Sequence, residues 1–203
     1  MMNSQKYKLS FTAASLSISE SVIVADVDLA CKNWDETKAT IKEKNLLQAR
    51  ASSSGIRVLH ELMQRLRELS DLQLELLVDG TVEEQKQLLW FAVSKTYSYI
   101  QEFAIEVVRE KFMSLNFELS SLDYEAFYSR KADWHSELDE ITASTQAKLR
   151  QVIFRMLREA NVISAEHFIM PTLLSPRVEA ALEPDAPTSY QIFPLHKINL
   201  SER

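Results

Sequence analysis

Leu88–Val108 reads LLWFAVSKTYSYIQEFAIEVV and is the most apolar part of the chain. A helix that spans a bilayer needs about 20 residues with few or no charges, and this stretch contains Lys95, Glu102 and Glu106. We therefore expect it to lie in the core of a globular protein. β-Branched and hydroxyl-bearing residues cluster at Thr96–Ser98, which disfavours a continuous helix. The pattern predicts two core helices that meet at this break.

Glycine is scarce outside this stretch as well, because the 203 residues include only Gly55 and Gly80. Two isolated glycines cannot form a phosphate-binding loop of the P-loop or Rossmann type, and few turns can be built without glycine. The chain is therefore predicted to be all-α. The single Cys31 excludes an intrachain disulfide, and no charged and apolar leader opens the chain. Both features predict a cytoplasmic protein.

Four polar residues carry the signals of helix N-caps. Ser17 and Thr81 are each followed three residues later by glutamate, as in a capping box. Asn33 precedes an amphipathic stretch, and Ser175 precedes Pro176, which suits the first turn of a helix. Helices are predicted to begin directly after each of the four.

These signals divide the chain into three predicted regions. Residues 1–79 are predicted to form an N-terminal helical lobe, in which a serine-rich turn between two helices resembles a helix-turn-helix. Residues 80–182 are predicted to form a C-terminal helical bundle, with at most a small hairpin between 162–163 and 167–171. Residues 183–203 hold three of the five prolines and several apolar side chains. We expect an extended tail that docks on the helical body.

A one-sided basic helix is predicted between Ser144 and Ile163. The chain as a whole has a net charge of −6, yet this segment has four basic residues and one acid. At about 100° per residue its apolar side chains form one face, and a basic stripe lies opposite. A one-sided stripe indicates an anionic partner, although long basic side chains also cover a core with their aliphatic stems. The stripe consists of Lys148, Gln151, Arg155 and Arg158.

A second basic region extends from Lys38 to Arg67 and contains seven basic residues and two acids. Its serine-rich turn lies where the next helix is expected to begin, and a helix N-terminus offers free N–H groups to a phosphate. The alternative is a capped helix without a ligand. The acids concentrate elsewhere, with seven between Glu118 and Glu140. The predicted phosphate contacts of this region are Arg50, Ser52, Ser53, Ser54, Arg57, Arg65 and Arg67.

Catalysis finds little support in the sequence. The four histidines are dispersed, and none has the i, i+4 spacing of a helical metal pair. Cys31 lies in an apolar helix without an evident base. No catalytic residue, metal ligand or cofactor is therefore predicted.

Several short stretches occur in one consistent order along most of the chain. They are Trp34-Asp35, Asn45–Gln48, Arg50–Ser53, Leu88-Leu89, Glu106–Phe112, Ser144–Gln151, Leu157–Ala160 and Leu173–Val178. In these stretches the chain resembles the BrxA family of bacterial BREX phage-defence systems. The resemblance implies an all-helical bundle similar in part to the antitermination factor NusB, with DNA binding as the activity.

The sequence thus predicts a non-enzymatic component of a BREX system that binds double-stranded DNA, mainly through phosphate contacts. Two alternatives remain open. A NusB-like fold also suits an RNA-binding module, because a fold does not fix its ligand. The basic faces also suit a scaffold that contacts acidic surfaces of other BREX components. No membrane partner is predicted, and the oligomeric state stays open.

Overall fold

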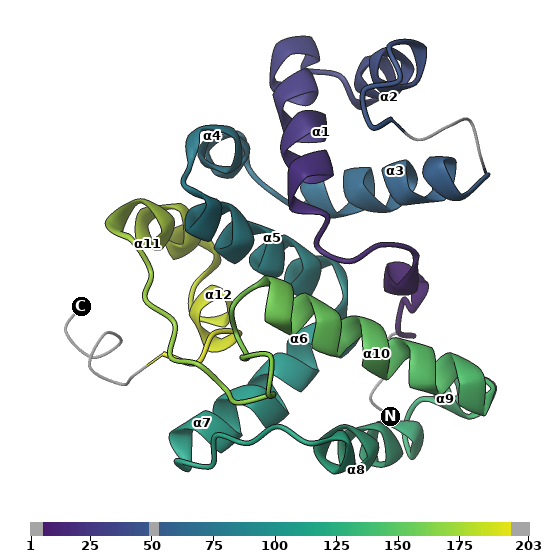
Figure 1. The fold of residues 1–203 in the computed structure, drawn as a ribbon, viewed down its shortest axis with the longest axis vertical. Helices are drawn as coiled ribbons and strands as arrows, with labels where there is room; N and C mark the ends of the chain where they lie inside the picture. Colours follow the sequence, from purple (N-terminus) through teal and green to yellow (C-terminus); the bar gives the residue numbers. More distant parts are fainter. Residues whose placement is uncertain (1–5, 49–52, 196–203) are drawn as a thin grey trace.

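The computed structural model describes residues 6–48 and 53–195. Within these ranges the chain forms helices joined by turns and isolated β-bridges, without a β-strand, so the all-α prediction is confirmed. Figure 1 shows the arrangement. The first half of the chain contains η1 (Ser10–Ala13), α1 (Ile18–Cys31), α2 (Trp34–Glu43), α3 (Ser53–Leu66), α4 (Asp71–Asp79) and α5 (Val82–Thr96). The second half contains α6 (Ser98–Phe103), η2 (Ala104–Arg109), α7 (Glu110–Met113), α8 (Ser121–Ala132), α9 (Ser136–Asp139), α10 (Ala143–Glu159), α11 (Pro176–Leu182), η3 (Glu183–Asp185) and α12 (Thr188–Gln191).

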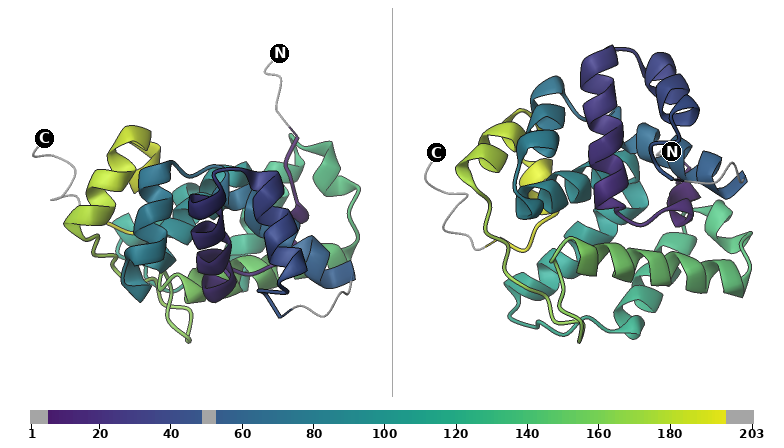
Figure 2. Two further views of the ribbon diagram at one scale, coloured as in Figure 1. Left: turned by 90° about the horizontal axis from the view of Figure 1, so that it is seen from above. Right: turned by 45° about the horizontal axis from the view of Figure 1, so that its top comes forward.

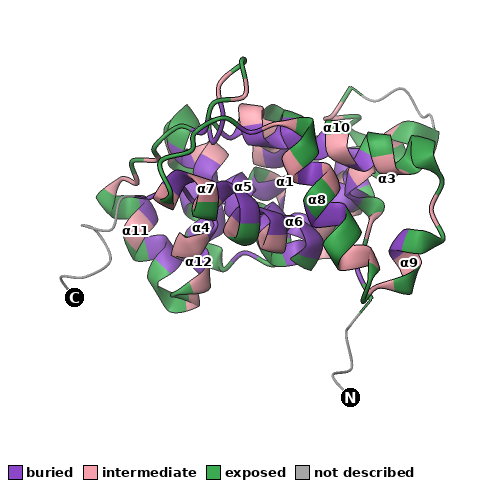
Figure 3. Cartoon of the chain, turned by 90° about the horizontal axis from the view of Figure 1, so that it is seen from below, coloured by how far each residue is buried: buried purple, intermediate pink, exposed green. Residues whose placement is uncertain are grey.

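The predicted core helices are α5 and α6, and they meet at the expected break. Tyr97 between them has an extended backbone, and α6 begins at the next residue. Trp90, Tyr99 and Phe103 are fully buried, and buried residues concentrate along both helices in Figure 3. α5 packs against α1, α3, α4, α10 and α11, so it is the centre of the fold. No helix of the described residues combines the length and apolarity needed to cross a membrane.

Three of the four predicted N-caps are confirmed. Asn33 accepts hydrogen bonds from two backbone N–H groups of α2, Thr81 forms a capping box with Glu84, and Ser175 caps α11. A helix does begin directly after Ser17, but the predicted capping box there is wrong, because the φ of Ser17 is 50° and its side chain makes no capping bond. Leu16 directly before it is buried and hydrogen-bonded to Glu159. The chain must therefore turn sharply at Ser17 to enter α1.

The segment after α11 is not extended, which corrects the prediction for residues 183–203. It contains η3 and α12. Pro184 lies in the first turn of η3, where its missing N–H costs no helical hydrogen bond, and Pro187 is the N-cap residue of α12. The segment does dock on the helical body, since Ile192, Phe193 and Leu195 are buried. Residues 196–203 lie outside the described part of the chain.

The predicted hairpin is reduced to single bridges. Ile163 pairs with Ile169, and Phe168 pairs with Glu118 from the segment before α8, both antiparallel. The segment around residue 168 therefore lies between two other chain segments, which fixes the turn that connects 163 to 169.

Candidate nucleic-acid interface

The predicted basic helix is α10, and its two faces differ as expected. The side chains of its apolar face are buried, among them Leu149, Ile153 and Met156. Lys148, Gln151 and Arg155 of the predicted stripe are exposed, whereas Arg158 is half-buried. Since α10 packs on η1 and α5, its exposed face points away from the core. The stripe is thus available to a partner along most of its length.

Part of the charge on α10 is paired within the protein. Arg155 forms an ion pair with Glu159 one turn later, with 2.8 Å between Nε and Oε1, and its side chain remains 63% exposed. Arg150, outside the stripe, pairs with Glu125 of α8. Lys148 donates a 3.3 Å hydrogen bond to Gln151. Exposed pairs of this kind contribute only about 0–1 kcal/mol, so a phosphate can replace Glu159 as the partner of Arg155.

The second predicted region surrounds the start of α3. Arg50 and Ser52 lie outside the described residues. Ser53 and Ser54 form the exposed first turn of α3, and Arg57 is exposed one turn later. α3 and α10 begin on the same side of the molecule, with η1 between them (Figures 1 and 2). The two predicted basic surfaces therefore belong to neighbouring helices.

Several cations around α2 and α3 have no carboxylate within 4.0 Å among the described residues. One of them, Arg67, is exposed at the end of α3, and its guanidinium carbon lies 5.4 Å from the ring centroid of Trp34 on α2. These unpaired cations, which form the α2–α3 surface, are Lys38, Lys42, Lys44, Arg57 and Arg67. The exposed Asp35, Glu36 and Glu43 of α2 and Glu68 after α3 also form no ion pair with the described residues, so the excess of positive charge on this surface is small.

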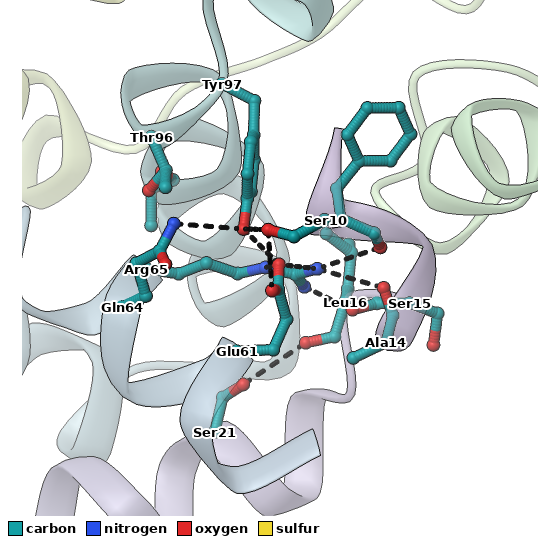
Figure 4. A network of polar contacts seen from close by, with 12 residues as sticks. Ser10, Ala14, Ser15, Leu16, Ser21, Glu61, Gln64, Arg65, Thr96 and Tyr97 are labelled. Atoms are coloured by element: carbon teal, nitrogen blue, oxygen red, sulfur yellow. Dashed lines mark hydrogen bonds and ion pairs between the residues drawn. The ribbon is translucent and has the colours of Figure 1, made fainter. Parts of the chain in front are cut away.

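Arg65 is not on this surface, which corrects its prediction as a phosphate contact. Its exposed fraction is 2%, and it forms a buried ion pair with Glu61, 3.0 Å away. Its guanidinium also donates to the main-chain carbonyls of Phe11, Ala14 and Ser15 (Figure 4). The guanidinium of Arg65 is therefore hydrogen-bonded within the protein and buried, so no phosphate can reach it.

The network around Arg65 connects the two basic surfaces. Tyr97 donates a hydrogen bond to Glu61, and burial, with the bond to the Glu61 carboxylate, raises the pKa of Tyr97 to about 12. Ser10 of η1 donates to the same carboxylate at 3.3 Å. At the other end of this segment the Leu16 N–H donates to Glu159 of α10 at 2.8 Å. The segment from Ser10 to Leu16 therefore holds α3 and α10 in a fixed relation.

The acidic region is partly neutralised within the protein. Asp123 pairs with Lys111 at 2.8 Å. Among the described residues the exposed Asp133, Asp139 and Glu140 around α9 have no such partner. The described residues also contain no group of three or more His, Cys, Asp and Glu side chains that could hold a metal ion.

Comparison with known proteins places the chain in a family. The model of the BrxA family matches residues 5–185. A BREX protein BrxA from Bacillus cereus (strain H3081.97) is 27% identical, and the match covers 63% of this chain and 64% of that protein, just under two thirds of its length. A BREX protein BrxA from Escherichia coli O9:H4 (strain HS) is 23% identical over 81% of this chain and 78% of its own.

A solved structure has the same fold. The crystal structure of an uncharacterized protein from Magnetospirillum magneticum has a TM-score of 0.82 and 22% sequence identity, and it covers 93% of this chain and 98% of its own. A likeness at this identity shows the fold alone. The family match, in contrast, spans most of the sequence and agrees with the names of the relatives. The chain therefore belongs to the BrxA family of BREX proteins.

Proposed function

We propose that this protein is a non-enzymatic, cytoplasmic component of a BREX phage-defence system that binds double-stranded DNA. The affinity comes mainly from phosphate contacts, so binding depends strongly on salt and weakly on sequence. The α2–α3 surface and the α10 stripe contact the duplex. The serine-rich turn and the N–H groups at the start of α3 complete the first of these surfaces.

One observation carries the proposal: unpaired cations gather on neighbouring helices of a chain that is acidic overall. The chain has 29 acids and 23 basic residues, so an even mixture would leave few cations without a carboxylate nearby. Instead five cations on or beside α2 and α3 form no ion pair with the described residues, and Lys148 of the α10 stripe forms none either. Unpaired cations of this kind suit the phosphates of a polyanion.

The first experiment is a salt titration of binding to several unrelated DNA duplexes. We expect log K to fall linearly with log salt concentration, with a similar slope for each duplex. Equal competition by duplex RNA would favour the RNA-binding alternative. A protein that retains no DNA at physiological salt would favour the scaffold alternative.

Charge reversal tests the assignment of the surface. The double variant Lys148→Glu, Arg155→Glu should reduce affinity for every duplex and lower the salt slope by roughly one unit for each lost contact. Arg130→Glu is the matched control, because Arg130 is exposed on α8 and makes no ion pair with the described residues. The control should bind like the wild type. Equal losses in both variants would show only a general charge effect.

A further inference from the structure

The last turn of α10 brings two basic side chains into direct contact. Nη1 of Arg158 lies 2.9 Å from Nε2 of His167, which belongs to the turn after the helix. Among the described residues neither side chain has a carboxylate within 4.0 Å. Two side chains that can each carry a positive charge are thus in contact, and no carboxylate of the described residues neutralises them.

The chemistry of the two groups settles which atom donates. A guanidinium has five N–H donors and no acceptor, so Nε2 of His167 must accept. The ring is therefore neutral in this arrangement, and its proton is on Nδ1. Nδ1 has no hydrogen-bond partner among the described residues. The remaining N–H groups of Arg158 and the Nδ1–H of His167 are consequently donors without an acceptor among the described residues.

The backbone holds the imidazole ring of His167 in place. The N–H of His167 donates to the carbonyl of Ser164 at 3.1 Å, and its own carbonyl accepts from Leu119 at 2.9 Å. The ring stands edge-on to Phe154 of α10, with 5.2 Å between centroids. The φ of His167 is 67°, a conformation that a non-glycine residue keeps where its surroundings impose it. The contact with Arg158 is therefore part of a constrained turn.

We propose that Arg158 and His167 together bind one backbone phosphate of duplex DNA. This inference rests on the proposed function and adds His167 to the α10 stripe as a residue that contacts the phosphate. The phosphate supplies the missing acceptor for both side chains. Its negative charge favours the protonated imidazole, since an opposite charge nearby stabilises the charged form. Protonation puts a hydrogen on Nε2, so this atom no longer accepts from Arg158, and both side chains donate to the phosphate instead. Binding is therefore coupled to the uptake of a proton by His167.

The charged groups around His167 come from three chain segments. Arg158 approaches from α10, and Glu166 precedes His167 in the turn, where it accepts a hydrogen bond from the Ser164 hydroxyl at 3.0 Å. Glu118 lies on the segment that pairs with Phe168. Neither acid forms an ion pair with His167. The phosphate would thus be the first counter-charge in contact with the Arg158–His167 pair.

The test compares DNA affinity between about pH 5.5 and pH 8, the range in which histidine titrates, at constant ionic strength. Wild-type affinity should rise several-fold as the pH falls, with a limit of about tenfold per pH unit for one proton. In His167→Asn this rise should disappear, because asparagine does not titrate and also tolerates the left-handed backbone. His196→Gln is the control, since His196 belongs to neither of the two basic surfaces and this variant should keep the rise.

The outcomes separate this inference from the function on which it rests. If wild-type protein binds no duplex at any pH, the proposed function fails. If it binds DNA and His167→Asn keeps the full pH dependence, or His196→Gln loses it, the phosphate contact of His167 is refuted. Should His167→Asn not fold, NMR of the wild type decides the question. The ring signals of His167 should shift on addition of duplex DNA, and unchanged signals would overturn the proposal.

Discussion

The indole N–H of Trp90, in the centre of α5, donates a 3.0 Å hydrogen bond to the main-chain carbonyl of Ile192. The bond joins the most buried helix to the C-terminal segment. Lys95 of α5 adds an ion pair with Asp185, 2.8 Å away. Since Ile192 and Phe193 are both 1% exposed, this segment forms part of the core and is not an appendage.

Removal of all residues after Leu182 should therefore destabilise the protein. Burial of three apolar side chains contributes on the order of 5 kcal/mol, which corresponds to a fall in melting temperature of roughly 10–20 °C at this chain length. Thermal unfolding followed by circular dichroism measures the loss, and removal of residues after Leu195 is the matched control. DNA affinity should remain nearly unchanged, because the removed residues are nearly balanced in charge. An unaltered melting temperature would contradict the role of this segment in the core.

Arg65 and Arg67 should respond differently to the same substitution. Arg65→Met leaves the Glu61 carboxylate buried without its partner, which costs about 3–5 kcal/mol. Arg67→Met removes an exposed side chain above Trp34 and should cost about 1 kcal/mol or less. Urea unfolding of both variants measures the difference. Equal stabilities would mean that the buried network does not hold α3 against the segment from Ser10 to Leu16.

The features that were predicted correctly from the sequence depend on residues close together along the chain. The caps at Asn33 and Thr81 need only the next three residues, and the break at Tyr97 follows from its immediate neighbours. The one-sided stripe of α10 likewise follows from helical periodicity. Ser17 differs because Leu16, the residue before it, is held by Glu159, which lies 143 positions away.

The burial of Arg65, which the sequence-based prediction placed on the surface, also depends on contacts between distant residues. Arg65 lies three residues after Leu62 and four before Leu69, on the buried side of α3, and this spacing was a signal that it faces the core. Its carbonyl partners, however, belong to residues 11–15, which no local pattern connects to α3. The contact between Arg158 and His167 depends in the same way on the turn after α10. Tertiary contacts of this kind cannot be predicted from the periodicity of the sequence.

Glu84 should make the free energy of unfolding depend on pH in the acidic range. The hydrogen bond from the Ser175 hydroxyl, followed by that from the Thr81 N–H, holds the pKa of Glu84 below its usual range. A carboxyl whose pKa is lowered by folding contributes stability above its unfolded pKa, and the contribution is lost as the pH falls through the folded value. Glu84→Gln should cost about 1.5–3 kcal/mol at pH 7 and much less near pH 3.

The control for this prediction is Glu83→Gln. Glu83 is the neighbouring acid of α5, with a side chain that is 50% exposed and 3.7 Å from Lys86. Its substitution should change the free energy of unfolding little at either pH. Urea unfolding at both pH values compares the two variants. A Glu84→Gln variant that loses the same stability at both pH values would show that packing, and not the charge, is responsible.

Arg57 offers the sharpest test of the surface at the start of α3. It is exposed one turn into the helix and has no ion-pair partner among the described residues, so its removal should not disturb the fold. If Arg57 contacts a phosphate, Arg57→Ala should weaken binding by a similar factor for every duplex and reduce the salt slope by roughly one unit. Arg130→Ala, which removes another exposed cation, on α8, should change neither quantity. A loss confined to one DNA sequence would instead indicate that Arg57 reads a base edge, because phosphate contacts carry no sequence information.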